Sequence, residues 1–379
     1  MNYYDNTDKK LCALENNFDF LYYITPANHV ESWLSFAESG LQKVPEIKYR
    51  PKPPLEELKE QAQSLQKEIE GPEVLREIYR AKIDETLAMI SLVESIGQSE
   101  FKALSIQLFG QPDLLLLDTA KSILEKVDSN VGHKQNVHAK QLKEIFDAQI
   151  KIYAKTYPYF TPEVIVREDI DSMLVSRTKL FIGAGFSTSL QRAHALCAHE
   201  VGTHLVTHFN GLRQPVKLFA YGLAGYDEVQ EGLAVLSEYL VAGLSKHRMR
   251  VLAGRIIAVD AMLHGCSFME LFNLLNSYYE FAALDAFEMC SRVFRGGAFT
   301  KDTIYLRGVL QVKEMLQNGS PLLPLYLGKI SFMETEKIEE MQSAGLSIEP
   351  CITPHFVQKE SFKQRLNALH AKSIEELID

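Results

Sequence analysis

Apolar residues recur at intervals of three and four along most of the chain, and this period predicts a helix-dominated protein. The clearest case follows the proline-rich linker at residues 48–54, where one face of an amphipathic helix is marked by Leu55, Leu58, Ala62 and Leu65. The same period predicts further helices, which span about 73–97, 112–128, 137–155, 187–208, 228–245, 247–264, 267–280, 281–294, 302–317 and 331–344.

One segment departs from the helical period. Residues 159–188 are rich in β-branched and aromatic side chains and contain Gly183 and Gly185 near their end, which predicts two or three β-strands. The chain is therefore expected to have an α+β fold dominated by helices, with one small sheet directly before the helix at 187–208.

Composition narrows the class of protein. Of the 379 residues, 46% are hydrophobic and 23% are charged, which is typical of a globular protein with a sizeable core. The 40 basic and 49 acidic residues give a net charge of −9. We therefore expect no nucleic-acid partner and no attraction to an anionic membrane surface.

The chain shows no pattern that directs it to a membrane or to an oxidising compartment. It lacks a basic segment followed by an apolar one near its start, and no apolar run reaches about 18 residues, so we expect neither a secretory signal nor a transmembrane helix. The cysteines are scattered and odd in number, which is typical of reduced thiols: Cys12, Cys197, Cys266, Cys290 and Cys351. We predict a cytoplasmic protein, and the sequence leaves its oligomeric state open.

Three histidines and a glutamate crowd one predicted helix, in "CAHEVGTHLVTHFNG" (197–211). His199 and Glu200 resemble the start of the H-E-x-x-H zinc helix, in which histidines at i and i+4 bind zinc and the glutamate is a general base. Here the second histidine is His204, five residues on, and a regular helix would turn it about 140° away from His199. A π-bulge near Gly202 would restore a shared face.

Two alternatives remain for this helix. His204 and His208 are four residues apart and share a face without distortion, but no carboxylate follows His204 to act as a base. Histidines on a half-buried helix are also common as hydrogen-bonded core residues that bind no metal.

A catalytic zinc usually has three protein ligands and one open position, so a further acid is needed. The segment "AGYDEVQEGLAVLSEYL" (224–240) offers Glu231, followed by Gly232, which would let this helix pack closely on the histidine helix. Glu238, seven residues on, would orient a ligand. By itself Glu231 reads as a solvated glutamate near a helix start. Together with the two histidines and Glu200 it completes the set found in two-histidine, one-glutamate zinc hydrolases.

These segments, and a third one "RVFRGGAFTKDTIYLRG" (292–308), resemble the QEGLA-motif protein family in content and order. That family includes the microtubule-associated tyrosine carboxypeptidases and many bacterial proteins labelled as flavohaemoglobin-expression modulators. The resemblance covers roughly residues 160–345 and implies a gluzincin-like core with Zn²⁺ as cofactor and Glu200 as the catalytic base. The zinc ligands that it implies are His199, His204 and Glu231.

On this reading the chain divides into three regions. Residues 1–157 form a helical N-terminal region, and residues 158–246 form the catalytic core with the small sheet and both motif helices. Residues 247–379 form a helical C-terminal region that completes the active-site cleft.

The third block gathers four basic residues in an acidic protein: Arg292, Arg295, Lys301 and Arg307. A carboxypeptidase must bind the terminal carboxylate of its substrate, and arginine does this by bidentate hydrogen bonding. The alternative is a solvated basic face, or pairing with local acids such as Glu288 and Asp302. Tyr305, Arg292 and Arg295 are also candidates for stabilising the oxyanion, and Tyr305 is the predicted catalytic residue among them.

The strand expected at 178–187 lies just before the histidine helix. If it is an edge strand, its backbone near Gly183 and Gly185 would bind an extended peptide by main-chain hydrogen bonds. The alternative is a simple turn before the helix.

Together these features predict a zinc-dependent metallocarboxypeptidase whose substrate is the C-terminus of a peptide or protein, and the resemblance implies a preference for terminal tyrosine or another aromatic residue. Two other classes remain. One is a zinc amidohydrolase with a closed pocket for a small non-peptide amide. The other is a regulatory protein whose metal is structural or absent, against which Glu200 argues, because a structural site needs no base.

Overall fold

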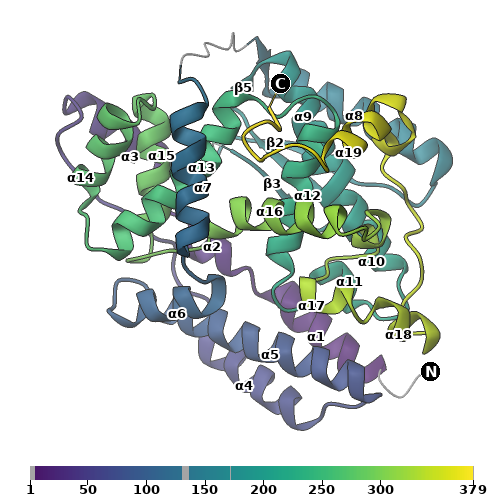
Figure 1. Ribbon diagram of the computed structural model, residues 1–379. Helices are drawn as coiled ribbons and strands as arrows, with labels where there is room; N and C mark the ends of the chain where they lie inside the picture. Colours follow the sequence, from purple (N-terminus) through teal and green to yellow (C-terminus); the bar gives the residue numbers. More distant parts are fainter. Residues whose placement is uncertain (1–4, 130–135, 171, 379) are drawn as a thin grey trace. The chain divides into compact units, whose positions relative to one another are not determined.

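The computed structural model describes residues 5–129, 136–170 and 172–378. The chain forms two compact units, each built from two segments: Met1–Ser129 with Arg250–Leu306, and Asn130–Met249 with Arg307–Asp379. Helices predominate in both units, and every strand among the described residues lies in the second unit, so the expected helix-dominated α+β fold is confirmed (Figure 1). The three regions expected from the sequence are not tested by this grouping.

The described part of the first unit contains helices and no strand. The amphipathic helix expected after the linker is α4, whose apolar stripe is buried and which packs against α1 and α5. The helices are α1 (Asp5–Asn17), α2 (Phe20–Ile24), α3 (His29–Glu38), α4 (Leu55–Lys67), α5 (Glu73–Glu94), α6 (Glu100–Phe109), α7 (Leu114–Lys126), α13 (Lys246–Leu263, which begins in the second unit), α14 (Phe268–Asn273), η2 (Leu274–Tyr278) and α15 (Ala283–Phe294).

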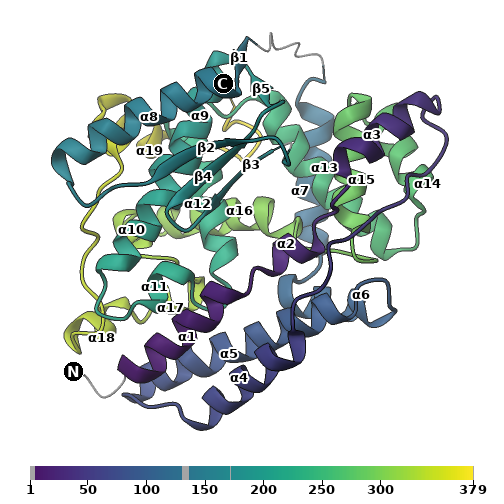
Figure 2. The same cartoon turned by 180° about the vertical axis from the view of Figure 1, so that it is seen from behind.

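The described residues of the second unit form two small sheets. One pairs β1 (Val137–His138) antiparallel with β5 (Ser187–Thr188). The other has the strand order β2–β4–β3, with bounds Glu163–Arg167, Lys179–Gly183 and Met173–Ser176. Figure 2 shows these three strands side by side, and α8 (Ala139–Thr156) packs against β2 and β4. The strands expected within 159–188 are confirmed.

β4 is the central strand of its sheet, so the expectation that it forms an open edge is wrong. Each of its residues pairs with β2 in parallel, and Lys179–Ile182 also pair with β3 antiparallel. The N–H of Gly183 donates to the carbonyl of Ser172 (2.8 Å), and Gly185 lies exposed in the turn that follows. The predicted main-chain binding of a peptide at Gly183 and Gly185 required a free strand edge, and β4 has none. The residues after β4 form a turn before the helix, which was the alternative expected from the sequence.

The helices of the second unit surround the histidine motif. The helix expected at 187–208 is divided into α9, η1 and α10, and α12 packs along η1. The bounds are α9 (Leu190–Leu196), η1 (Cys197–Leu205), α10 (Val206–Arg213), α11 (Leu218–Tyr221), α12 (Tyr226–Leu240), α16 (Thr303–Gln317, which begins in the first unit), η3 (Leu323–Tyr326), α17 (Phe332–Thr335), α18 (Ile338–Ser343), η4 (His355–Gln358) and α19 (Glu360–Ala368). Within the described ranges, no helix combines the length and the apolar character needed to cross a bilayer.

A buried amide ties the C-terminal segment to α10. The side chain of Asn210 donates to the carbonyls of Tyr326 (2.8 Å) and Ile352 (2.9 Å) and accepts from the N–H of Ile352 (2.7 Å). Because every polar atom of this amide is paired with backbone, the end of the histidine helix has a fixed place against the C-terminal segment.

The close approach at Gly232 is to α16 and not to the histidine helix, so this detail of the sequence interpretation is wrong. A Cβ at Gly232 would lie 2.3 Å from the carbonyl of Gly308, and a Cβ at Gly308 would lie 2.2 Å from the carbonyl oxygen of Glu228. The two helices therefore cross backbone to backbone, one residue from Glu231.

We expect Gly232→Ala to lower the free energy of unfolding by roughly 3 kcal/mol, because the added methyl group forces apart two backbones that cannot move independently. Urea unfolding measures this change. Gly185→Ala is the matched control, since nothing lies within 4 Å of a Cβ at that position. Its expected effect is within about 0.5 kcal/mol. Equal stability of the two variants would contradict the tight crossing.

Candidate functional site

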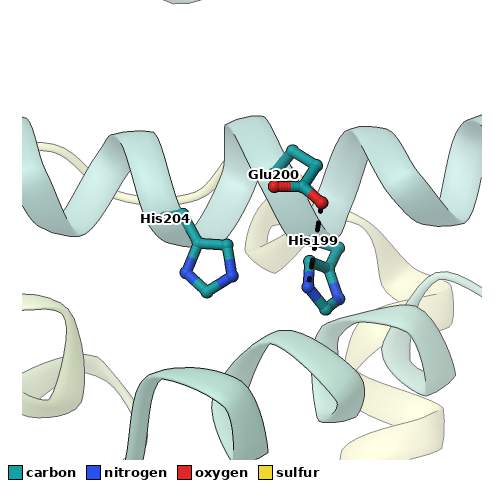
Figure 3. A group of neighbouring side chains, drawn as sticks. All are labelled: His199, Glu200 and His204. Atoms are coloured by element: carbon teal, nitrogen blue, oxygen red, sulfur yellow. Dashed lines mark ion pairs between the residues drawn. The ribbon is translucent and has the colours of Figure 1, made fainter. Parts of the chain in front are cut away.

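The histidine helix changes its hydrogen-bonding period where the motif lies. η1 is a π-helix of 9 residues, and at its end the N–H of Val206 bonds to the carbonyl of Val201, five residues back. His199 and His204 therefore point from the same side of the helix, with ring centroids 5.0 Å apart (Figure 3). The distortion predicted from the five-residue spacing is confirmed, although it extends beyond a single bulge.

A carboxylate from α12 faces both rings. Oε2 of Glu231 lies 3.8 Å from Nε2 of His199 and 3.9 Å from Nε2 of His204. Donor atoms about 2.1 Å from a tetrahedral ion are about 3.4 Å apart, so both distances from Glu231 are only slightly longer than those between the ligands of a bound ion. Two imidazole nitrogens and a carboxylate oxygen are a donor set that suits zinc. The residues at this position fit a metal ion in both chemistry and spacing.

A second carboxylate, that of Glu200, lies beside this group. Its Oε1 is 4.0 Å from Nε2 of His199, the ion pair drawn in Figure 3. One donor atom each from His199, Glu200 and His204 lie within 4.8 Å of one another. The sequence-predicted histidines and both glutamates are thus brought together by η1 and α12.

The other nitrogen of His199 is held by Glu238 of α12, as the sequence spacing suggested. Nδ1 of His199 lies 2.7 Å from Oε1 of Glu238 and donates there, so the lone pair of the neutral imidazole is on Nε2. Burial opposes protonation of His199, but the hydrogen bond to Glu238 and the neighbouring carboxylates outweigh it and raise the pKa of this imidazole. Arg192 of α9 donates two hydrogen bonds to the same buried carboxylate, and Arg248 lies 3.6 Å from it. Burial alone would raise the pKa of Glu238, but the charges of Arg192 and Arg248 hold it well below its usual range.

Burial also shifts the neighbouring groups. It raises the pKa of Glu200, and the negative charge of Glu231 raises it further, against the opposing charge of His199. It lowers the pKa of His204 well below 6.5, and the positive charges of His199 and Lys329 act in the same direction. His204 is therefore a neutral imidazole at pH 7, the form that donates a lone pair to metals.

His208 does not face Glu231 as His199 and His204 do. Its Nδ1 bonds to the carbonyl of Ala220 in α11 at 2.9 Å, and burial lowers its pKa to about 4. His208 is thus a hydrogen-bonded core residue, whereas Nε2 of His204 faces Glu231. The geometry favours His199 with His204 over the alternative pair of His204 with His208.

The basic residues of the third block are divided between the two units. Arg307 belongs to the second unit and binds Glu228 with two hydrogen bonds, one of them 2.9 Å from Nη2 to Oε2. Arg292 belongs to the first unit and is bidentate to Asp302, at 2.7 Å from Nε and 2.5 Å from Nη2. For these two arginines the alternative of pairing with local acids is confirmed, with Glu228 taking the place of Glu288.

Lys301 is buried in the first unit among aromatic rings, not displayed on a basic face. It is 3% exposed, and its Nζ lies 5.8 Å and 5.0 Å from the ring centroids of Phe20 and Phe109. Its charge is therefore stabilised by ring faces.

Arg295 is a buried cation in the first unit. It is 7% exposed, its guanidinium lies 4.5 Å from the ring centroid of Phe299, and Nη1 lies 3.4 Å from Oγ1 of Thr25. Its Nε has no hydrogen-bond partner among the residues that the structure describes. Burial, together with the charge of Arg292, lowers its pKa to about 10, so it stays protonated at neutral pH.

Tyr305 on α16 lies against two of the first unit's arginines. The guanidinium carbon of Arg255 is 4.9 Å from its ring centroid and that of Arg292 is 5.9 Å away. Arg255 also lies 3.8 Å from the carboxylate of Asp302. Sequence reasoning missed Arg255, because it belongs to a helix far from the third block and carries no motif of its own.

Two other residues were missed in the second unit. Arg192 sits one helix before the motif, and Gln230 immediately precedes Glu231. This adjacency carried no signal for Gln230, because neighbouring residues of a helix point about 100° apart.

The fold and the His–Glu group define a helix-rich α+β protein with a preformed two-histidine, one-carboxylate donor set on a π-helix. A sequence profile described as "Microtubule-associated tyrosine carboxypeptidase" matches residues 34–373. The chain therefore belongs to the microtubule-associated tyrosine carboxypeptidase family, and the resemblance stated from its motifs is confirmed.

Individual relatives are distant. The mouse microtubule-associated tyrosine carboxypeptidase 1 is 26% identical over 276 residues, which cover 66% of this chain and 56% of the mouse protein. The human protein of the same name is 28% identical over 230 residues, 55% of this chain and 46% of the human protein. The chain spans about half the length of the curated relatives it matches.

Proposed function

We propose that this protein is a zinc-dependent metallocarboxypeptidase with a gluzincin-like core. The observation that carries the proposal is the approach of Glu231 to both His199 and His204, with Glu200 beside them. Membership of a family whose description names a tyrosine carboxypeptidase supports the reaction class.

Two carboxylates border the histidines, and their distances support a different role for each. Oε2 of Glu231 is about equally near to Nε2 of both histidines, which is the position of a shared ligand. Glu200 follows His199 directly on η1 and adjoins that histidine at 4.0 Å. In this proposal Glu231 completes the ligand set, and Glu200 is left to exchange protons.

When bound, zinc would supply Lewis acidity to the scissile carbonyl and to the attacking water. Glu200 would take the proton from that water at a carboxylate oxygen and deliver it to the leaving amine. Glu238 would keep the proton of His199 on Nδ1, so that Nε2 stays available. Tyr305 remains the predicted donor to the oxyanion.

The substrate proposed is the free C-terminus of a peptide or protein in the cytoplasm. The relatives' names specify tyrosine as the residue removed, and for this chain we propose the same preference, extended to other aromatic side chains. Among the third-block residues, Arg295 is the one proposed to bind the terminal carboxylate. Arg292 and Arg307 are each occupied by an acid, and Lys301 lies over aromatic rings.

Metal analysis tests the site. We expect about one zinc per chain in carefully purified protein, and loss of most of it in His199→Ala and in Glu231→Ala, because each variant leaves two ligands. His208→Gln is the matched control and should keep its zinc, since Nδ1 of His208 is bonded to a backbone carbonyl. Full occupancy in both alanine variants would refute the ligand set, and loss only in the His208 variant would point to the alternative pair.

A further inference from the structure

Gln230 has a polar group that its surroundings leave unsatisfied. The residue is 2% exposed, and its Nε2 has no hydrogen-bond partner within the ranges that the structure describes. Its other amide atom, Oε1, lies 2.7 Å from Oγ1 of Thr207. Buried amide nitrogens are nearly always paired in proteins, so this one requires an explanation.

The hydroxyl of Thr207, which contacts this amide, has more acceptor neighbours than it can donate to. Oγ1 of Thr207 lies 2.9 Å from the carbonyl oxygen of Thr203 and 3.1 Å from that of His204, besides its contact with Gln230. All three neighbours are acceptors, and a hydroxyl has one hydrogen. At least one of the three contacts therefore lacks a hydrogen, even if the hydroxyl shares its hydrogen between the two carbonyls.

Exchanging the two ends of the amide resolves both conflicts. The oxygen and nitrogen of a glutamine are nearly equal in size, so the exchange changes no packing. Nε2 of Gln230 would then donate to Oγ1 of Thr207, whose own hydrogen goes to the backbone carbonyls of the helix. Oε1 would then face the side chain of His204, to which Gln230 lies close enough to oppose the lowering of its pKa by burial.

We propose that Gln230 is a positioning residue that fixes the tautomer of His204 by accepting a hydrogen bond from its Nδ1. A neutral imidazole has one N–H and one lone pair, so a proton held on Nδ1 leaves the lone pair on Nε2. Nε2 is the atom that lies 3.9 Å from Oε2 of Glu231. The metal-binding purpose of this bond rests on the proposed function, whereas the bond itself does not.

The opposite amide orientation would have the opposite effect. An N–H of Gln230 pointing at Nδ1 would move the imidazole proton to Nε2 and close that nitrogen to a metal. Thr207 opposes this, because its hydrogen is used by the backbone carbonyls and its hydroxyl can therefore only accept from the amide. α12 thus supplies one residue behind each histidine: Glu238 behind His199, and Gln230 behind His204.

The tautomer of His204 in the metal-free full chain tests the proposal directly. Long-range ¹H–¹⁵N NMR of ¹⁵N-histidine protein at pH 7.5, with the resonances assigned by their loss in His204→Gln, should show the Nδ1–H form. Gln230→Met removes the acceptor and should shift His204 toward the Nε2–H form. Gln230→Glu keeps an acceptor and should retain Nδ1–H. An Nε2–H wild type, or the same tautomer in wild type and Gln230→Met, would overturn the proposal.

Thr207 offers a matched pair if the Met variant does not fold. Thr207→Ser keeps the hydroxyl and should keep the Nδ1–H form, whereas Thr207→Val frees the amide to turn and should give a mixture. Identical tautomers in these two variants would remove Thr207 from the argument and leave the amide orientation unsupported.

Zinc affinity gives the second measurement. In competition with a chromophoric chelator, Gln230→Met should bind zinc about 10–100-fold more weakly than wild type, and Gln230→Glu should recover most of the loss. Unchanged affinity in Gln230→Met would contradict the positioning role. A wild type that bound no zinc would refute the proposed function, while the tautomer of His204 would still decide the role of Gln230.

Discussion

Glu200→Gln is expected to keep its zinc and its fold and to lose about 10²–10⁴-fold in kcat. The amide has the shape of the carboxylate but cannot accept the proton of the attacking water. Glu200 sits on η1 beside His199 and is 7% exposed, so bulk water cannot readily replace it as a base. Release of the terminal residue from a peptide ending in tyrosine measures kcat, and elemental analysis of the same sample measures the metal.

Glu231→Gln is the matched control for this experiment. It removes one charge from the same group, yet its expected result is a weakened metal site and not an inactive, zinc-loaded protein. Equal rates for wild type and Glu200→Gln would demote Glu200 to a structural role. Loss of zinc from Glu200→Gln, with retention in Glu231→Gln, would reverse the two assignments.

The centre of this site could be predicted because spacing on a helix constrains direction. His199 and His204 are five positions apart and could not share a metal on a regular helix, so a π-helical segment followed from the metal hypothesis, and η1 is such a segment. Glu231 and Glu238 are seven positions apart, which amounts to two turns, so both face the histidines from α12. These are local rules that need no knowledge of the tertiary fold.

Predictions about which element packs against which failed where the sequence indicates only that a segment is buried or closely packed. The apolar pattern of 179–183 indicates a buried strand, but it does not distinguish a central strand from an edge strand that helices cover. β4 is central. Gly232 indicates that another backbone passes close to α12, and that backbone is α16 at Gly308 rather than the histidine helix. Helices α1–α3 were missed because residues 1–50 mix polar and apolar positions without a sustained helical period, and tertiary packing decides such segments.

The four basic residues of the third block show the same limit. Their sequence spacing says that positive charge is concentrated, but not which charges are already neutralised. Arg292 is bound by Asp302, one of the local acids expected from the sequence, whereas Arg307 is bound by Glu228, which lies 79 positions away and was not expected. Arg295 differs, because no carboxylate among the described residues is hydrogen-bonded to it and burial holds its charge away from water.

Arg295→Gln is therefore expected to lower kcat/KM for a peptide with a free C-terminus by about 10²–10³-fold, while the corresponding C-terminal amide, already a poor substrate, changes little. A buried guanidinium and a carboxylate form a charge-assisted, bidentate contact that an amide substrate cannot reproduce. The ratio of acid to amide cleavage should thus collapse in the variant. Arg307→Gln is the control, since its guanidinium is held by Glu228, and its ratio should stay that of wild type.

Matched peptides ending in Tyr-COOH, Tyr-CONH₂ and Ala-COOH decide the matter when products are read by mass spectrometry. Wild type should release a single residue from the tyrosine acid, more slowly from the alanine acid, and barely from the amide. Equal cleavage of acid and amide, or cleavage inside the peptide, would make the protein an endopeptidase and remove this role from Arg295. An unchanged acid-to-amide ratio in Arg295→Gln would assign the carboxylate to another cation. No cleavage of any peptide by the zinc-loaded protein would leave the amidohydrolase and regulatory alternatives, for which Arg295 would be a structural cation over Phe299.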